Sequence, residues 1–165
     1  MPAFIFDRRD LDFVMYEQFD LAGLTKLDAF KEFSRETFDE VLTQGLQFVK
    51  DELAPTNTIA DREGCKLEGG KVKAPAVYKE VFKQFAEGGW IAMHRPQKFG
   101  GMVLPIPMYV ALTEAQIGAA SSFLFFPGLS VAAGHLLENY GKAELRDLIV
   151  PKLYNGQWTG TMCLT

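Results

Sequence analysis

Apolar residues that recur every three or four positions constrain this sequence more than any other feature. The clearest run lies between positions 38 and 53 and consists of Phe38, Leu42, Leu46, Val49 and Leu53. This spacing predicts one amphipathic helix. Ser34 is one candidate for its N-terminal cap, and Thr37 with Glu40 three residues later is the other. The helix is expected to end at Ala54-Pro55, because the residue before a proline is disfavoured in helical geometry.

The same spacing predicts further helices along most of the chain, and glycines and prolines separate them. The expected helical segments are 7–20, a fresh start at Thr25, a helix from Pro75 up to Gly88-Gly89, 108–117, about 122–137 and 142–153. The polar stretch 61–75 predicts a loop with a small hairpin across Gly69-Gly70, and residues 90–107 predict a second loop. Residues 158–165 are typical of the beginning of a strand. The sequence therefore predicts an all-α bundle of about six helices that ends in a first strand.

Composition and charge exclude several classes of protein. Hydrophobic residues make up 48% and charged residues 23% of the chain, which is the balance of an ordinary globular domain. The net charge is −4 without a cluster of Lys and Arg, so nucleic acid is not an expected partner. No apolar run approaches the roughly 18 residues of a membrane span. Because the N-terminus lacks a signal-peptide pattern and the two cysteines lack metal or redox spacing, we expect a cytoplasmic protein with reduced thiols.

Two patterns that resemble functional motifs do not meet the chemistry that those motifs need. Residues 64–72 resemble a phosphate-binding loop, but Gly70 stands where that motif has its lysine, and Val72 stands where it has Ser or Thr. His135 and Glu138 are expected on one helix face, yet one histidine and one carboxylate do not complete a metal site. We interpret the first pattern as a surface turn and the second as a solvated or hydrogen-bonded pair.

Pro127-Gly128 lies inside the helix expected over residues 122–137. An interior proline removes a backbone hydrogen bond and costs about 3 kcal/mol or more, so a bend is expected there. Two interpretations remain open. The bend either serves packing or forms the wall of a narrow apolar pocket.

Two longer segments resemble one known family. Phe85–Pro105 reads FAEGGWIAMHRPQKFGGMVLP, and Leu136–Thr165 reads LLENYGKAELRDLIVPKLYNGQWTGTMCLT. In this order, both resemble the front of an acyl-CoA dehydrogenase. The segments EGCKLEGGKVKAP, EGGW, FPGL and WTGTMCLT are most similar to the subgroup of 3-(methylthio)propanoyl-CoA dehydrogenases and their relatives. The resemblance divides the chain into an arm and helix extension (1–33), the helical domain (34–157) and the start of a β domain (158–165).

The resemblance implies a function and a cofactor. Members use FAD to oxidise an acyl-CoA to a trans-2-enoyl-CoA, taking the α-hydrogen as a proton and passing the β-hydrogen as hydride to flavin N5, as in fatty acid β-oxidation. It implies that Met162, Leu164 and Thr165 contact the flavin. It also implies that the acyl group lies against Phe125, Phe126, Gly128 and Leu129. Fixed donors beside a flavin are physically reasonable, because reduction places negative charge on the ring.

The resemblance covers the front of the family's chain, so part of the expected machinery is not in these residues. No glutamate here matches the family's catalytic base, and we expect residues 1–165 alone to be inactive. The full-length protein is expected to pass electrons to an electron-transfer flavoprotein and to form a homo-oligomer. The alternative hypothesis is a stand-alone helical interaction module, which has no reason to keep a bare strand at its end because unpaired strand edges aggregate.

Overall fold

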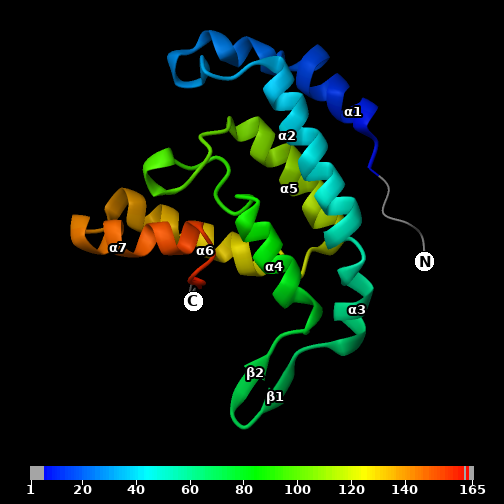
Figure 1. Cartoon of the computed structure of the whole chain (residues 1–165), viewed down its shortest axis with the longest axis vertical. Coiled ribbons are helices and arrows are strands. Elements are labelled where there is room, and N and C mark those ends of the chain that lie inside the picture. The colour runs from blue at the N-terminus through cyan, green and yellow to red at the C-terminus, as the bar shows by residue number, and fades with distance from the viewer. Residues whose placement is uncertain (1–5, 162, 164–165) are drawn as a thin grey trace.

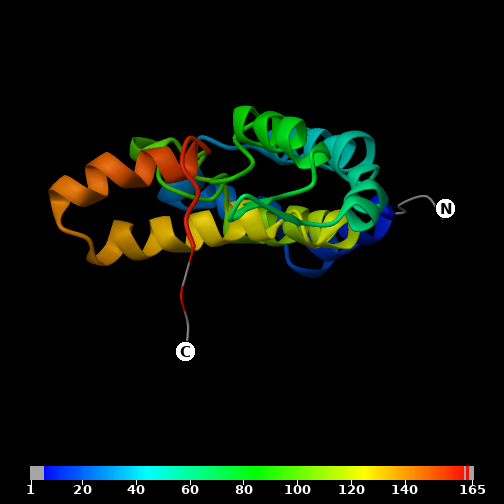
Figure 2. The same ribbon diagram turned by 90° about the horizontal axis from the view of Figure 1, so that it is seen from below.

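The computed structural model describes residues 6–161 and 163, and within them the fold is mostly helical, as predicted (Figure 1). In chain order its elements are α1 Arg8–Asp12, η1 Phe13–Gln18, η2 Leu21–Lys26, η3 Asp28–Phe30, α2 Arg35–Phe48, η4 Val49–Leu53, α3 Thr56–Glu63, β1 Lys66–Glu68, β2 Lys71–Lys73, α4 Val77–Glu87, η5 Gln97–Phe99, α5 Ile106–Ala120, α6 Phe125–Tyr140 and α7 Ala143–Tyr154. Figure 2 shows the helices in two layers, with the C-terminal segment crossing α6.

Helix α2 packs against α5. The Ser34 hydroxyl accepts a hydrogen bond from the Thr37 backbone N–H at 3.2 Å, so Ser34 is the cap. The predicted apolar stripe faces the core, since Phe38, Leu42, Val49 and Leu53 are fully buried. Gly45 belongs to the same face, and a Cβ atom there would lie 2.5 Å from Leu112 Cδ2 of α5. The small residue thus allows α2 and α5 to approach closely.

The chain does not leave helical geometry for long after α2. The π-helical segment η4 follows α2 and ends at Leu53, with Ala54 as its C-cap, so the element ends where it was predicted to end. The predicted reason is wrong, because Ala54 and Pro55 both keep helical dihedral angles. A further helix, α3, then begins at Thr56, which the sequence did not predict. The Thr56 hydroxyl donates to the Leu53 carbonyl at 2.7 Å and links the two segments. Since α3 buries small side chains such as Ala60 instead of a stripe of large ones, periodicity does not reveal it.

The predicted hairpin forms, with Leu67 opposite Val72 in the register of β1 and β2. Both side chains are more than 70% exposed, so this apolar pair packs against no core. The hairpin projects from the helical body (Figure 1).

The expected bend at Pro127 requires a correction. Helix α5 ends at Ala120, a turn follows over residues 121–124, and α6 begins at Phe125. Pro127 therefore lies in the first turn of α6, where its missing N–H has no intrahelical partner to lose. The break between the two helices lies in the turn, not at the proline.

The predicted loop 90–107 is observed between α4 and α5, over residues 88–105, and an ion pair fastens it to α6. The Arg95 guanidinium lies 3.1 Å from the Glu138 carboxylate, and the Tyr154 hydroxyl donates to the same oxygen at 2.7 Å. The side chains of Arg95 and Glu138 are only 11% and 13% exposed, so this pair is largely shielded from solvent. Glu138 thus pairs across the fold, while His135 on the same helix is exposed. Across residues 6–161 and 163, no helix has the length and apolar character needed to cross a membrane.

His94 in this loop predicts a pH dependence of stability. Its ring lies 4.0 Å from that of Tyr109, and burial, aided by the charge of Arg95, lowers the pKa of His94 to about 4. The unfolded chain binds the same proton near pH 6.5. Stability from the neutral ring is therefore complete above about pH 6.5 and is lost as the pH falls towards 4, by about 1 kcal/mol after allowance for solvent screening.

The comparison uses His94→Phe, which keeps a ring against Tyr109 but cannot be protonated. Urea unfolding at pH 7 and pH 4 should show that the wild type loses about 1 kcal/mol more than this variant between the two conditions. The exposed His135, changed to Gln, is the control and should stay close to the wild type, because burial and Arg95 lower the pKa of His94 more than the charge of His135 does. Equal losses in wild type and His94→Phe would contradict the prediction.

Candidate functional site

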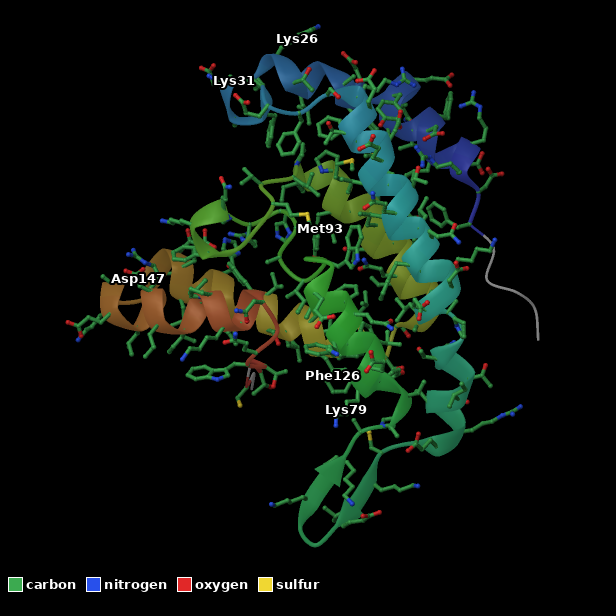
Figure 3. All side chains as sticks on the ribbon, viewed as in Figure 1. Lys26, Lys31, Lys79, Met93, Phe126 and Asp147 are labelled. Carbon is green, nitrogen blue, oxygen red and sulfur yellow. The ribbon has the colours of Figure 1, made fainter. Side chains whose placement is uncertain are left out.

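An apolar pocket opens where α4, the first turn of α6 and the C-terminal segment meet. Its volume is about 490 Å³, and its walls include Pro75, Tyr78, Lys79, Phe82, Phe126 and Thr159. Figure 3 shows Phe126 and Lys79 near one another, on the side of α4 that faces the hairpin. One wall residue, Thr159, precedes the expected flavin-contacting segment. Phe126, an expected acyl-binding residue, and Thr159, which precedes the expected flavin contacts, therefore line the same pocket.

Aromatic contacts fix the shape of this pocket. Tyr78 lies in the first turn of α4, and its ring meets Phe126 edge-on at 5.8 Å and Phe123 at 5.5 Å between centroids. The Tyr78 hydroxyl lies 2.6 Å from the Ser122 hydroxyl, in the turn before α6. Edge-to-face pairs and a satisfied hydroxyl hold the Tyr78 ring in one orientation. This contact couples the start of α4 to the start of α6.

A second hollow of about 500 Å³ adjoins the first and shares Pro75, Tyr78 and Phe126 with it. Its remaining walls are more polar and include Asn57, Asp61, Cys65, Ser121 and Ser122. The shared residues therefore stand between an apolar space and a polar one. An apolar chain is favoured on the Phe82 side, because that side offers apolar surface and few polar groups to desolvate.

A third, smaller cavity of about 220 Å³ lies between α4, α5 and α6 and is walled mainly by apolar residues, with Gly128 and Pro127 on one side. No heavy atom lies within 4 Å of the position that a Cβ atom at Gly128 would take, so the glycine leaves this wall open. The Thr113 hydroxyl also lines the cavity and is buried without a hydrogen-bond partner.

The structure separates the residues that the resemblance assigns to the acyl group. Phe126 lines the first two pockets and Gly128 the third. Phe125 is 69% exposed, and Leu129, which is half-buried, lines none of these three cavities. The expected flavin contacts Met162, Leu164 and Thr165 lie outside the described residues. The neighbouring Cys163 is exposed, and residues 158–161 form no strand.

Sequence reasoning missed two polar residues of this region. Tyr78 entered the prediction as one more apolar position of a helix, and Ser130 as part of a mostly apolar segment. The partners of both are distant in sequence, Ser122 for Tyr78 and Gly160 for Ser130. The sequence carried no local signal for these contacts, because helical spacing does not encode which residues meet across the fold.

The charged side chains that line the apolar pocket are two lysines. Lys73 and Lys79 line the pocket, and Lys73 is paired with Glu68. In the part of the chain that the structure describes, no three His, Cys, Asp or Glu side chains gather closely enough to hold a metal ion. The arrangement can thus hold an apolar chain beside positive charge.

Comparison with known proteins identifies the family to which this chain is related. Residues 35–157 match the model of the acyl-CoA dehydrogenase N-terminal domain. Two proteins of Syntrophomonas wolfei named butyryl-CoA dehydrogenase are each 30% identical over 166 residues, 98% of this chain. A 3-methylmercaptopropionyl-CoA dehydrogenase of Ruegeria pomeroyi is 32% identical over 157 residues, 95% of this chain. The chain spans 27% of the length of each relative.

The contact between Tyr78 and Ser122 predicts a measurable coupling. Tyr78→Phe and Ser122→Ala each remove one hydroxyl, and each should lower the free energy of unfolding by about 1 kcal/mol. The double variant should lose little more than either single variant, because one hydrogen bond accounts for both effects. Urea unfolding of the four proteins measures this cycle. Additive losses would show that the two hydroxyls act independently.

Proposed function

Because this chain belongs to the acyl-CoA dehydrogenase family, we propose that the full-length protein oxidises an acyl-CoA to its trans-2-enoyl-CoA with FAD as electron acceptor. The observation that carries the proposal is the apolar pocket beside Phe126 and Thr159, within a chain whose residues 35–157 match the family's N-terminal domain. The names of the relatives from S. wolfei and R. pomeroyi support an acyl-CoA as the substrate.

In this proposal, the residues of this chain bind and orient the acyl group. Phe126 and Phe82 offer apolar surface to it, and Tyr78 holds the Phe126 ring in place through the edge-on contact. Lys79, which lines the pocket, supplies positive charge for the anionic groups of CoA. Gly128 keeps a second apolar space open on the opposite side of α6. The base that removes the α-proton comes from residues outside positions 1–165, so this chain alone is inactive.

The described residues fit the beginning of a flavin site. Thr161 and Cys163 are exposed. A backbone in that position can present N–H groups to a ligand or to a sheet. We assign flavin contacts to Met162, Leu164 and Thr165 on the family resemblance. FAD, when bound, supplies the two-electron acceptor for the reaction.

Further partners follow from the same assignment. We propose that the reduced protein delivers its electrons to an electron-transfer flavoprotein, that the full-length protein is a homo-oligomer and that it works in the cytoplasm. The absence of a clustered Lys and Arg surface in the sequence is consistent with a small-molecule substrate instead of nucleic acid.

The proposed function is tested on the full-length protein loaded with FAD. Under anaerobic conditions, about one equivalent of an acyl-CoA substrate per site should bleach the visible absorbance of the oxidised flavin. A series from butyryl-CoA to long-chain acyl-CoA, with the methylthio compound included, identifies the acyl group. A protein that binds no FAD, or a flavin that no acyl-CoA bleaches, would contradict the proposal.

The pocket assignment is tested by two adjacent phenylalanines. Phe126→Ala in the full-length enzyme removes a wall of the pocket, so kcat/KM for the best acyl-CoA should fall about 10-fold, equivalent to about 1.4 kcal/mol of lost binding in the transition state. Phe125→Ala alters an exposed side chain one position away and should change kcat/KM less than about 2-fold. Equal effects would place the acyl group elsewhere on α6.

A further inference from the structure

Ser130 of α6 makes two hydrogen bonds that face different parts of the molecule. Its hydroxyl donates to the Phe126 carbonyl one turn earlier, at 2.7 Å, and accepts from the Gly160 backbone N–H at 3.0 Å. The residue is 1% exposed, so neither bond is weakened by competing solvent. The second bond spans 30 residues of sequence and ties the C-terminal segment to the middle of the helix.

Gly160 lies against α6 so closely that it has room for no side chain. A Cβ atom there would lie 2.8 Å from the Cβ of Ala133 and 3.4 Å from the Cα of Ser130. Contacts below 3.0 Å between such atoms force one of the two backbones to move. The close approach is what brings the Gly160 N–H within reach of the Ser130 hydroxyl.

The residues just before Gly160 are fastened as well. The Trp158 N–H donates to the Lys152 carbonyl at 2.9 Å, and the Lys152 ammonium lies 4.2 Å from the centroid of the Trp158 ring. The Gln157 N–H donates to the Asn155 side chain at 3.0 Å. The segment from Asn155 to Gly160 therefore follows a defined path over α7 and α6.

We propose that Ser130 is a positioning residue that sets where the chain enters the flavin site relative to the acyl pocket. The inference rests on the proposed function. Gly160 precedes Met162 by two residues, which reach at most about 7 Å, so its anchor restricts where the flavin-contacting segment begins. The same hydroxyl bonds the backbone of Phe126, which lines the pocket together with Thr159. The buried Ser130 hydroxyl thus links Phe126 at the proposed acyl pocket to Gly160, which precedes the proposed flavin contacts.

Alignment between the two sites matters because hydride transfer depends on distance. A displacement of about 1 Å between reacting groups can cost about 100-fold in rate, even when binding is unchanged. Loss of the Ser130–Gly160 bond should therefore lower kcat more than it alters KM. Loss of a residue that only stabilised the fold would not lower kcat while leaving KM unchanged.

The experiment uses the full-length protein with FAD and the variant Ser130→Ala. Thr56→Val is the matched control, because Thr56 is 2% exposed and its hydroxyl also donates to a backbone carbonyl at 2.7 Å, but far from Gly160. We expect Ser130→Ala to lower kcat about 10-fold, to change KM less than about 2-fold and to alter the absorption spectrum of the bound flavin. Hydrogen exchange of the Gly160 amide should speed up about 10-fold or more. Thr56→Val should change none of these readouts.

A second route reaches the same contact without removing the hydroxyl. Gly160→Ala should reproduce the loss in kcat, because its methyl group meets Ala133, and the added change Ala133→Gly should restore it by making room. Unchanged kcat and flavin spectrum in Ser130→Ala, equal effects of Ser130→Ala and Thr56→Val, or no rescue by Ala133→Gly would overturn the inference. A wild type that binds no FAD would instead defeat the proposed function, while the exchange of the Gly160 amide would still test the contact.

Discussion

The contact between Tyr154 and α6 is the interaction on which the arrangement of this half of the molecule depends. The ring lies where a side chain at Gly134 would otherwise be, and its hydroxyl bonds Glu138 one turn later. Burial, and next the bond to Glu138, raises the pKa of Tyr154, so the hydroxyl remains a donor at any physiological pH. Glu138 in turn holds Arg95 of the long loop. Helices α6 and α7 and the loop are thereby fixed to one another, and removing either charge would leave the other buried and unpaired.

Where local physics decides the structure, the sequence predicted it well. The stripe of α2 and the hairpin across Gly69-Gly70 follow from contacts within a few residues, and Ser34 is one of the two caps that the sequence left open. Helix α3 was missed because its buried face is made of small residues, which periodicity does not distinguish from a loop. The error at Pro127 has a related cause. A proline in the first turn of a helix and one in its interior look alike until the start of that helix is known.

The candidate site was less predictable, because residues distant in sequence build it. Phe126 was singled out through the family resemblance, and its neighbour Phe125 shared that assignment although only one of them lines the pocket. Which of two adjacent residues faces inward depends on the exact phase of α6, and the phase depends on where the preceding turn ends. Tyr78 illustrates the same limit, since its partner Ser122 belongs to a turn whose position no pattern marked.

The anchored path of residues 155–160 also bears on where this helical unit ends. The family match stops at residue 157, yet the polar and close-packed contacts continue to Gly160. A boundary drawn at 157 would leave the Ser130 hydroxyl without one of its two partners and would expose the strip of α6 that Gly160 covers. The packed helical domain therefore extends beyond residue 157, where the family match ends, to Gly160. Residues 158–160 pack against α6 and α7 although they lie beyond the family match. A cut at residue 157 would therefore remove contacts on which the helices depend.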